Sequence, residues 1–283
     1  MSAKKPTVAI LYDFDKTLCT KDMQEYAFIP SLGLSAEEFW TETGKLAKSE
    51  KMDSILAYMY LMVRKSKAKM LPLKRDNFVS LGESVEFFPG VESWFDRISE
   101  FGKECGVEIE HYIISSGLKE IIEGCPICHK FKEVYACEFH YDENGVADWP
   151  KTAVNYTTKT QFLFRINKGV TDITDDVNLN RFIPNDDRPI PFRNMIYIGD
   201  GMTDVPCMKL VKVNGGQSIA VYRDQRRETV EELLRDRRVD FVAPADYENG
   251  NELDGIVRNI IRKMAVVNEL VETNRRQLQE SAE

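Results

Sequence analysis

Residues 8–18 constrain the fold more than any other stretch of the sequence. Five apolar or aromatic residues, Val-Ala-Ile-Leu-Tyr, are followed at once by Asp13 and, two positions later, by Asp15. An uninterrupted apolar run is typical of a short strand buried on both faces, as in the middle of a parallel sheet. Ligands of open α/β sheets bind just beyond the carboxyl ends of such strands. Two acids placed there repel each other, so the stretch indicates either a divalent metal site or one protonated carboxyl, or else a strand followed by an ordinary Asp-rich turn.

A second stretch of the same kind lies far downstream. After Asn194, residues 195–198 form another apolar run, which Gly199 ends, and Asp200 and Asp204 follow across a turn. Glycine at the end of a buried strand allows close approach of other groups. Further strand-like runs alternate with segments of helical spacing, which predicts an α/β fold with a doubly wound parallel sheet. These runs are residues 107–114, 218–222 and 240–242.

Two other positions supply groups that suit an anion. The run 107–114 ends at Ser-Ser-Gly, where the Ser115 hydroxyl and the backbone N–H groups around Gly117 can meet a phosphoryl oxygen at the start of the next helix. Lys159 stands at the predicted start of a helix that follows two threonines, so its ammonium can lie over a phosphate and against carboxylates. Lys151 and Lys168 are alternatives for this role.

Taken together, these segments resemble the four ordered motifs of the haloacid dehalogenase (HAD) superfamily, whose members are mostly magnesium-dependent phosphatases. The resemblance runs from residue 8 to about residue 246. It implies a nucleophile, Asp13, that becomes an aspartyl phosphate, and an acid and base, Asp15, that serves the leaving alcohol and then the attacking water. It also implies Mg²⁺ held by Asp13, Asp200 and the backbone carbonyl of Asp15, with Asp204 completing the acidic surround. The phosphate-binding residues that it implies are Ser115, Gly117 and Lys159.

Residues 21–87 read as helical, with Ser35 as a capping residue and no strand signal. A helical insert at this place resembles the small cap of the phosphoserine-phosphatase-like branch of the superfamily. We therefore predict a core of residues 1–18 and 89–283 and a cap domain of residues 19–88. Phosphoserine phosphatases carry a Glu shortly after the first motif that meets the substrate amine. Here Asp22 occupies the comparable position and Glu25 is close by, so both are predicted to influence specificity, and phosphoserine is one of several candidate substrates.

Three segments allow two interpretations each. Cys125, Cys128 and Cys137 stand among histidines with some of the spacing of a zinc site, or they are ordinary thiols of a turn and a strand. The second interpretation is supported by the turn sequence of residues 142–145, which predicts a β-hairpin. Residues 169–193 form a predicted surface loop, either a passive insertion or a specificity element. The basic run in residues 64–75 is either a solvated face or a surface that steers anions.

Composition and hydropathy limit which partners and which cellular location we expect. The net charge of −8 and the pI of about 5.2 argue against nucleic acid as a partner. No apolar run approaches the roughly 20 residues of a membrane span, and no signal-peptide pattern precedes the first strand, so we expect a cytoplasmic protein that does not bind membranes. Its expected partner is a small phosphorylated metabolite, and it is expected to be a monomer or a homodimer.

Three functions are compatible with the motifs: a phosphatase, a phosphotransferase that uses the same intermediate, and a regulatory module that binds without turnover. The acids that catalysis needs, Asp13, Asp15 and Asp200, are all present. Their presence favours an enzyme, and the acid at Asp15 favours hydrolysis of phosphate monoesters.

Overall fold

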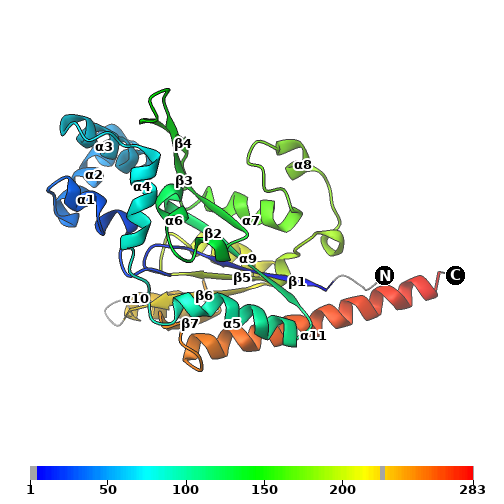
Figure 1. The fold of residues 1–283 in the computed structure, drawn as a ribbon. Coiled ribbons are helices and arrows are strands. Elements are labelled where there is room, and N and C mark those ends of the chain that lie inside the picture. The colour runs from blue at the N-terminus through cyan, green and yellow to red at the C-terminus, as the bar shows by residue number, and fades with distance from the viewer. Residues whose placement is uncertain (1–4, 224–226, 283) are drawn as a thin grey trace.

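Strands and helices alternate through most of the chain, as Figure 1 shows. The computed structural model describes residues 5–223 and 227–282. Within these residues, seven strands form one sheet in the order β4-β3-β2-β1-β5-β6-β7, and every neighbouring pair is parallel except β3 and β4. The strands are β1 (Thr7–Tyr12), β2 (Glu108–Leu118), β3 (Glu133–Tyr141), β4 (Ala147–Thr152), β5 (Met195–Gly199), β6 (Gln217–Tyr222) and β7 (Phe241–Pro244). The predicted α/β fold with a doubly wound, mostly parallel sheet is confirmed.

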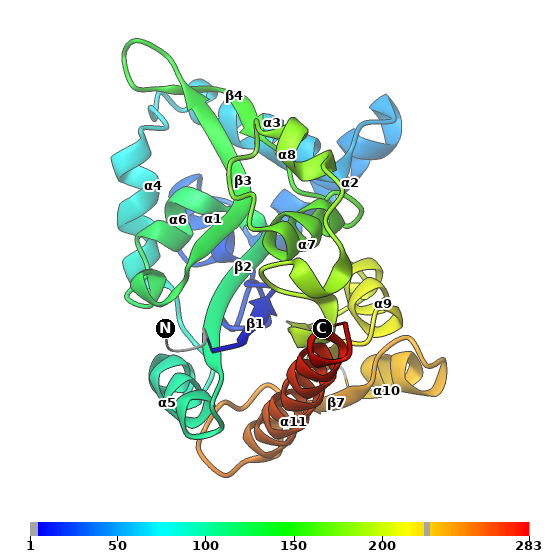
Figure 2. The ribbon, with the colours of Figure 1, turned by 90° about the vertical axis from the view of Figure 1, so that its right-hand side faces the viewer.

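Helices cover both faces of the sheet. In Figure 2, α5 and α11 lie on one side of it and α7 and α9 on the other. The helices of this core are α5 (Val91–Glu104), α6 (Lys119–Glu123), α7 (Lys159–Lys168), α8 (Asp176–Asn180), α9 (Val205–Val213), α10 (Arg227–Arg235) and α11 (Glu252–Glu280). No helix in the described ranges combines the length and the apolar character that a bilayer span requires.

The position of β1 in the sheet follows from its sequence. Residues 8–12 have no exposed surface, because the strand pairs with β2 on one side and β5 on the other while helices cover both faces. The backbone N–H of Asp13 continues the pairing with β5 by donating to the carbonyl of Ile198 at 2.9 Å. The acids after β1 and those after β5 therefore emerge side by side at one edge of the sheet.

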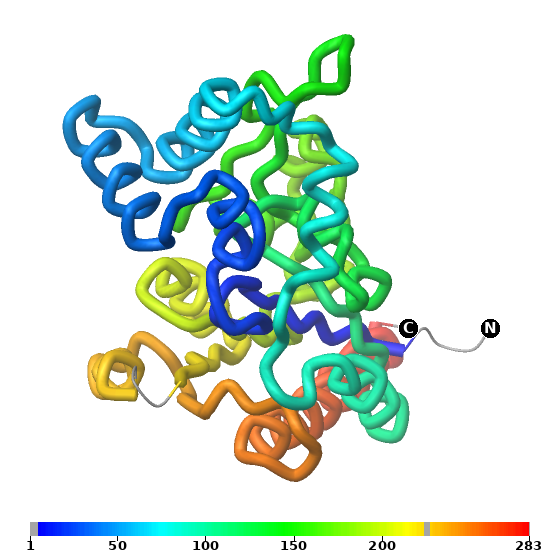
Figure 3. Tube along the Cα trace, turned by 60° about the vertical axis from the view of Figure 1, so that its left-hand side comes forward, coloured from blue at the N-terminus to red at the C-terminus, as the bar shows by residue number. Residues whose placement is uncertain are grey.

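The segment between β1 and α5 is helical, as predicted. Its helices are α1 (Phe28–Ser31), α2 (Ala36–Glu50), α3 (Ser54–Ala68) and α4 (Arg75–Leu81). The predicted cap at Ser35 is part of a capping box: its side chain accepts from the N–H of Glu38, and the Glu38 carboxylate accepts from the N–H of Ser35. In Figure 3 the blue-to-cyan coils of these helices lie together in the upper part of the view. The domain boundaries at residues 18/19 and 88/89 stay predictions.

Two linker segments join the helical insert to the sheet, and they are hydrogen-bonded to each other. The N–H of Thr20 donates to Glu86 at 2.9 Å, and that of Phe88 donates to Leu18 at 3.0 Å. Farther along, α4 lies directly on α6. A Cβ on Gly124 would come within 1.8 Å of a backbone carbonyl of α4, so this contact requires glycine.

Several segments differ in detail from the sequence-based predictions. The second core strand does not end at residue 114, because β2 continues through the Ser-Ser-Gly segment to Leu118. The interval 169–193, predicted to be a loop, contains α8 and a 3-10 turn, Asn185–Asp187. Arg165 holds this insertion: its buried guanidinium donates to the carbonyls of Asp172 and Ile173.

The cysteines do not form the zinc site that was one of the two interpretations. Among the described residues, the only group of metal-ligating side chains that lie close together consists of aspartates. The predicted hairpin is present as β3 and β4, and Cys137 lies buried in β3, where its Sγ accepts from the N–H of Val154 at 3.2 Å. All six cysteines are free thiols.

A series of buried side chains is hydrogen-bonded to Tyr12 of β1, and the histidine in it should make the stability of the protein depend on pH. Trp94 donates to the Tyr12 hydroxyl, which contacts His111 Nδ1 at 3.0 Å, and His111 Nε2 contacts Ser99. Burial lowers the pKa of His111 to about 4, below the usual value of about 6.5. The unfolded chain therefore binds a proton between these values that the folded protein does not bind. Stability should fall on the order of 2 kcal/mol from about pH 7 to about pH 4.5 for this reason.

Urea unfolding at both pH values, with wild type and His111→Gln, measures this contribution. The glutamine variant should be less stable at neutral pH and should lose less stability on acidification. Equal losses in the two proteins would show that His111 does not cause the pH dependence.

Candidate active site

A cavity of about 560 Å³ opens at the edge of the sheet where β1 and β5 end. Both acid motifs reach it, and the helical insert and the segment before α7 add one wall each. Its lining residues are Asp13, Asp15, Lys16, Asp22, Ile55, Ser116, Tyr156, Lys159, Asp200, Gly201, Met202, Thr203 and Thr229.

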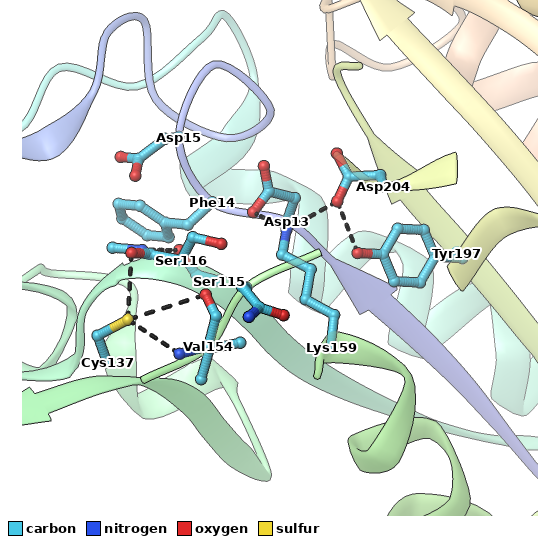
Figure 4. Close-up of polar contacts among 12 residues, drawn as sticks. Asp13, Phe14, Asp15, Ser115, Ser116, Cys137, Val154, Lys159, Tyr197 and Asp204 are labelled. Carbon is cyan, nitrogen blue, oxygen red and sulfur yellow. Dashed lines mark hydrogen bonds and ion pairs between the residues drawn. The ribbon is translucent and has the colours of Figure 1, made fainter. Parts of the chain in front are cut away.

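A buried lysine joins the two acid motifs at the base of this cavity (Figure 4). The Nζ of Lys159, at the first position of α7, donates to Asp13 at 2.8 Å and to Asp204 at 2.7 Å. The Tyr197 hydroxyl donates to the same Asp204 oxygen at 2.8 Å. All four side chains are buried. One cation thus fixes the carboxylate that follows β1 against the carboxylate that follows β5.

The charges of this cluster are strongly coupled. Burial, and then repulsion by Asp204, raises the pKa of Asp13 to about 7, although the Lys159 ammonium opposes the shift. Burial alone would lower the pKa of Lys159, but the two carboxylates outweigh it and hold that pKa above its ordinary value. Lys159 therefore stays charged, and Asp13 is an acid whose ionised form needs further positive charge nearby.

Asp15 has a different environment from Asp13. Its Oδ1 accepts a hydrogen bond from the N–H of Met23 at 2.8 Å, and Lys159 does not contact it. Burial, followed by repulsion from Asp22 and Asp13, raises the pKa of Asp15 well above its usual range. Asp15 thus favours the protonated form, whereas Asp13 is paired with a cation. This separation suits a general acid beside a nucleophile.

The acids also fit a divalent cation. Carboxylate oxygens of Asp13, Asp200 and Asp204 lie within 4.8 Å of one another. Oδ2 of Asp204 is buried without a hydrogen-bond partner, as expected for an atom that faces a charge the protein does not itself provide. Gly199 makes room for it, since a Cβ there would stand 2.6 Å from this oxygen. A set of carboxylate oxygens suits Mg²⁺ better than zinc.

A comparison with known protein families shows to which family this chain belongs. The haloacid dehalogenase-like hydrolase family model matches residues 10–209, which contain both acid motifs and Lys159. The chain belongs to this family.

One sequence relative and two solved structures match this chain over most of its length. A relative from Borreliella burgdorferi, described as an uncharacterized protein, is 28% identical over 282 residues, covering 89% of this chain and 96% of the relative. The structure of a probable phosphoserine phosphatase from Vibrio cholerae has a TM-score of 0.59 and 16% identity, covering 94% of this chain and 67% of that one. A phosphoserine phosphatase solved as a phospho-aspartyl intermediate analogue has a TM-score of 0.55 and 15% identity. The match covers 90% of this chain and 99% of that one. At these identities the two structures show the fold alone.

Of the three lysines considered for the phosphate site of this HAD-like hydrolase, only Lys159 lies in the cavity. Lys151 is paired with Glu138 on the hairpin, at 2.8 Å. Lys168 donates to backbone carbonyls of the insertion after α7, those of Leu179 and Arg181. The geometry therefore agrees with the choice of Lys159, and its phosphate-binding role stays a prediction.

The Ser-Ser-Gly segment places its two hydroxyls differently. Ser115 is fully buried, and its Oγ accepts from the N–H of Gly117 at 2.9 Å, whereas Ser116 lines the cavity. Gly117 has no space for a side chain, because a Cβ would stand 2.1 Å from Met23 and 2.8 Å from the Asp15 carboxylate. The phosphate-binding roles of Ser115 and Gly117 stay predictions, with Ser116 as the more accessible hydroxyl.

The two predicted specificity residues are placed differently. Asp22 lines the cavity, where it forms an ion pair with Lys16. Glu25 is not among the described residues that line the cavity, and its carboxylate accepts from the Trp40 indole at 2.7 Å inside the helical insert. Asp22 can therefore meet a substrate directly, while Glu25 supports the insert.

Sequence reasoning missed several residues of the site. Tyr197 holds Asp204, and its only sequence signal is a hydroxyl-bearing residue within an otherwise apolar strand. Ile55 and Tyr156 line the cavity from the insert and from the segment before α7. They carry no motif, so only the tertiary structure reveals them.

Proposed function

We propose that this HAD-like hydrolase is a magnesium-dependent phosphatase that hydrolyses a small phosphate monoester through an aspartyl phosphate. The observation that carries the proposal is the contrast between two neighbouring acids in one cavity. Asp13 is held by the buried ammonium of Lys159, while Asp15 accepts from the N–H of Met23 and favours its protonated form. The fold shared with a phosphoserine phosphatase solved as a phospho-aspartyl intermediate analogue supports the same chemistry.

In the first step, a carboxylate oxygen of Asp13 attacks phosphorus, and the bond from phosphorus to the alcohol oxygen breaks. Asp15 gives its proton to that departing oxygen. In the second step, water attacks the phosphorus of the aspartyl phosphate while Asp15 takes a proton from it. The bond from phosphorus to the Asp13 oxygen breaks, which releases inorganic phosphate and restores both acids to their starting forms.

Lys159 and the bound metal ion would both offset the negative charge of the phosphoryl group. Lys159 reaches the nucleophile directly and can neutralise negative charge as it redistributes. Asp13, Asp200 and the backbone carbonyl of Asp15 would hold Mg²⁺, with Asp204 beside them. When bound, the ion offsets the negative charge of the phosphate and of the attacking carboxylate, which otherwise repel each other.

Phosphate release from p-nitrophenyl phosphate and from a panel of small phosphate monoesters tests this proposal. We expect turnover with Mg²⁺, loss of turnover with EDTA, and recovery when excess Mg²⁺ is added back. Phosphoserine is one member of the panel, together with phosphorylated amino alcohols and sugars. A folded protein that binds Mg²⁺ and turns over no member would favour the regulatory alternative.

The same assay separates the phosphotransferase alternative. With an added acceptor alcohol, a hydrolase releases one inorganic phosphate for each leaving alcohol. A phosphotransferase would release more leaving alcohol than phosphate and would form a new phosphate ester, which phosphorus NMR detects.

A further inference from the structure

Asn155, in the segment between β4 and α7, makes polar contacts in two directions. Toward α7, its side-chain Oδ1 accepts from the N–H of Thr157 at 3.1 Å and of Thr158 at 2.9 Å. Its backbone carbonyl accepts from the N–H of Lys159 at 2.9 Å. The turn that begins the lysine-bearing helix is therefore built on Asn155.

Toward the helical insert, the Nδ2 of Asn155 donates to Oδ2 of Asp53 at 2.9 Å, across 102 residues of sequence. The other oxygen of Asp53 caps α3 by accepting from the N–H of Ile55 at 2.8 Å and of Leu56 at 3.2 Å. Beside this contact, the Tyr156 hydroxyl lies 3.3 Å from Ser54. The side-chain amide of Asn155 thus links the first turn of α3, through Asp53, to the turn that begins α7.

Each of these two turns carries a residue that lines the cavity. Ile55 lines it from α3, and Lys159 lines it from α7, where it also binds Asp13. Because each turn is hydrogen-bonded to the Asn155–Asp53 pair, a shift of one turn relative to the other requires that this pair break.

We propose that Asn155 is a positioning residue that sets the insert wall of the cavity relative to Lys159 through its bond to Asp53. The inference rests on the proposed phosphatase function. The simpler alternative is that Asn155 only caps the turn before α7 and that its contact with Asp53 has no effect on the site.

A reciprocal exchange of the two side chains distinguishes these roles. Asn155→Asp keeps an oxygen for the turn before α7 but removes the donor and sets a second carboxylate against Asp53. Asp53→Asn keeps a good capping residue for α3. The double variant, Asp53→Asn with Asn155→Asp, restores a donor and an acceptor with their places exchanged.

We expect Asn155→Asp to lower kcat/KM for p-nitrophenyl phosphate by about tenfold, because small displacements of catalytic groups are costly. Asp53→Asn keeps the oxygen that caps α3 but sets an NH2 group against the Asn155 donor, so it should also lower kcat/KM, by about threefold. The double variant should recover most of both losses. Asn180→Asp, the same change of charge on exposed α8, is the matched control and should have no effect. A loss that the double variant does not recover, or no loss in Asn155→Asp, would overturn the proposal.

Amide hydrogen exchange tests the coupling without any substrate. In Asn155→Asp, the amides of Leu56 in α3 and of Lys159 in α7 should both exchange faster, and both should slow again in the double variant. Faster exchange at Lys159 alone would assign Asn155 a local role and overturn the proposal. Absence of turnover of every member of the phosphate-ester panel in wild type would instead favour the regulatory alternative over the phosphatase function, while the exchange data would still decide whether Asn155 couples the two turns.

Discussion

Asp13→Asn should abolish phosphate release, with a loss of kcat on the order of 10⁴-fold or more. The amide that replaces the carboxylate is a poor nucleophile. Among the described side chains, the only other one that accepts from the Lys159 ammonium is Asp204, so no second carboxylate takes the place of Asp13. Mg²⁺-dependent release from the best substrate of the panel, in wild type and variant, measures the effect. Asp148→Asn, which removes an exposed carboxylate of β4, is the matched control and should keep full activity.

The variant should nevertheless fold. Asp13→Asn removes one of two buried acids that repel each other and leaves the pair of Lys159 with Asp204 intact. We therefore expect a Tm equal to or above that of wild type in the absence of Mg²⁺. A folded variant that keeps more than about a tenth of the activity would rule out Asp13 as the nucleophile.

Lys159→Met should damage both stability and activity. It leaves the carboxylates of Asp13 and Asp204 buried without their cation, and breaking a buried pair from one side costs about 3–5 kcal/mol. The same loss of positive charge beside the phosphate should lower kcat at least about 100-fold. Urea unfolding and steady-state assays measure the two effects separately.

The stability loss in Lys159→Met should depend on pH in a defined direction. Without Lys159, the pKa of Asp13 rises further above its value in the unfolded chain, since the group that opposed the shift is gone. An acid whose pKa is higher in the folded than in the unfolded protein stabilises the folded state at low pH. This stabilisation is lost as the pH rises through the folded-state pKa. The deficit relative to wild type should therefore be smaller at about pH 5 than at about pH 8. A deficit independent of pH would contradict the charge-based explanation.

Lys151→Met and Lys168→Met are the controls for the choice among the three lysines. Within residues 5–223 and 227–282, Lys151 forms only an exposed ion pair, so its loss should cost less than about 1 kcal/mol and leave kcat unchanged. Lys168 holds the insertion after α7, so its loss should affect stability more than turnover. A larger loss of kcat in either variant than in Lys159→Met would assign the phosphate-site cation to that lysine.

The sequence by itself determined the elements that depend on local pattern. The apolar run before Asp13 is typical of a strand covered on both faces, and a strand of that kind belongs in the middle of the sheet, where β1 lies. The helical insert follows from apolar spacing and from the capping box at Ser35, both of which act within a few residues. The acid pairs were recognisable because each stands directly after such a strand.

Only the tertiary structure decided which distant groups meet. It brings Lys159 rather than Lys151 or Lys168 to Asp13, and it joins Asn155 to Asp53. These contacts depend on the order of strands in the sheet and on how the insert packs against it. The physical reason is that a polar contact forms between atoms within about 3 Å, whereas sequence periodicity only specifies which face of an element is buried.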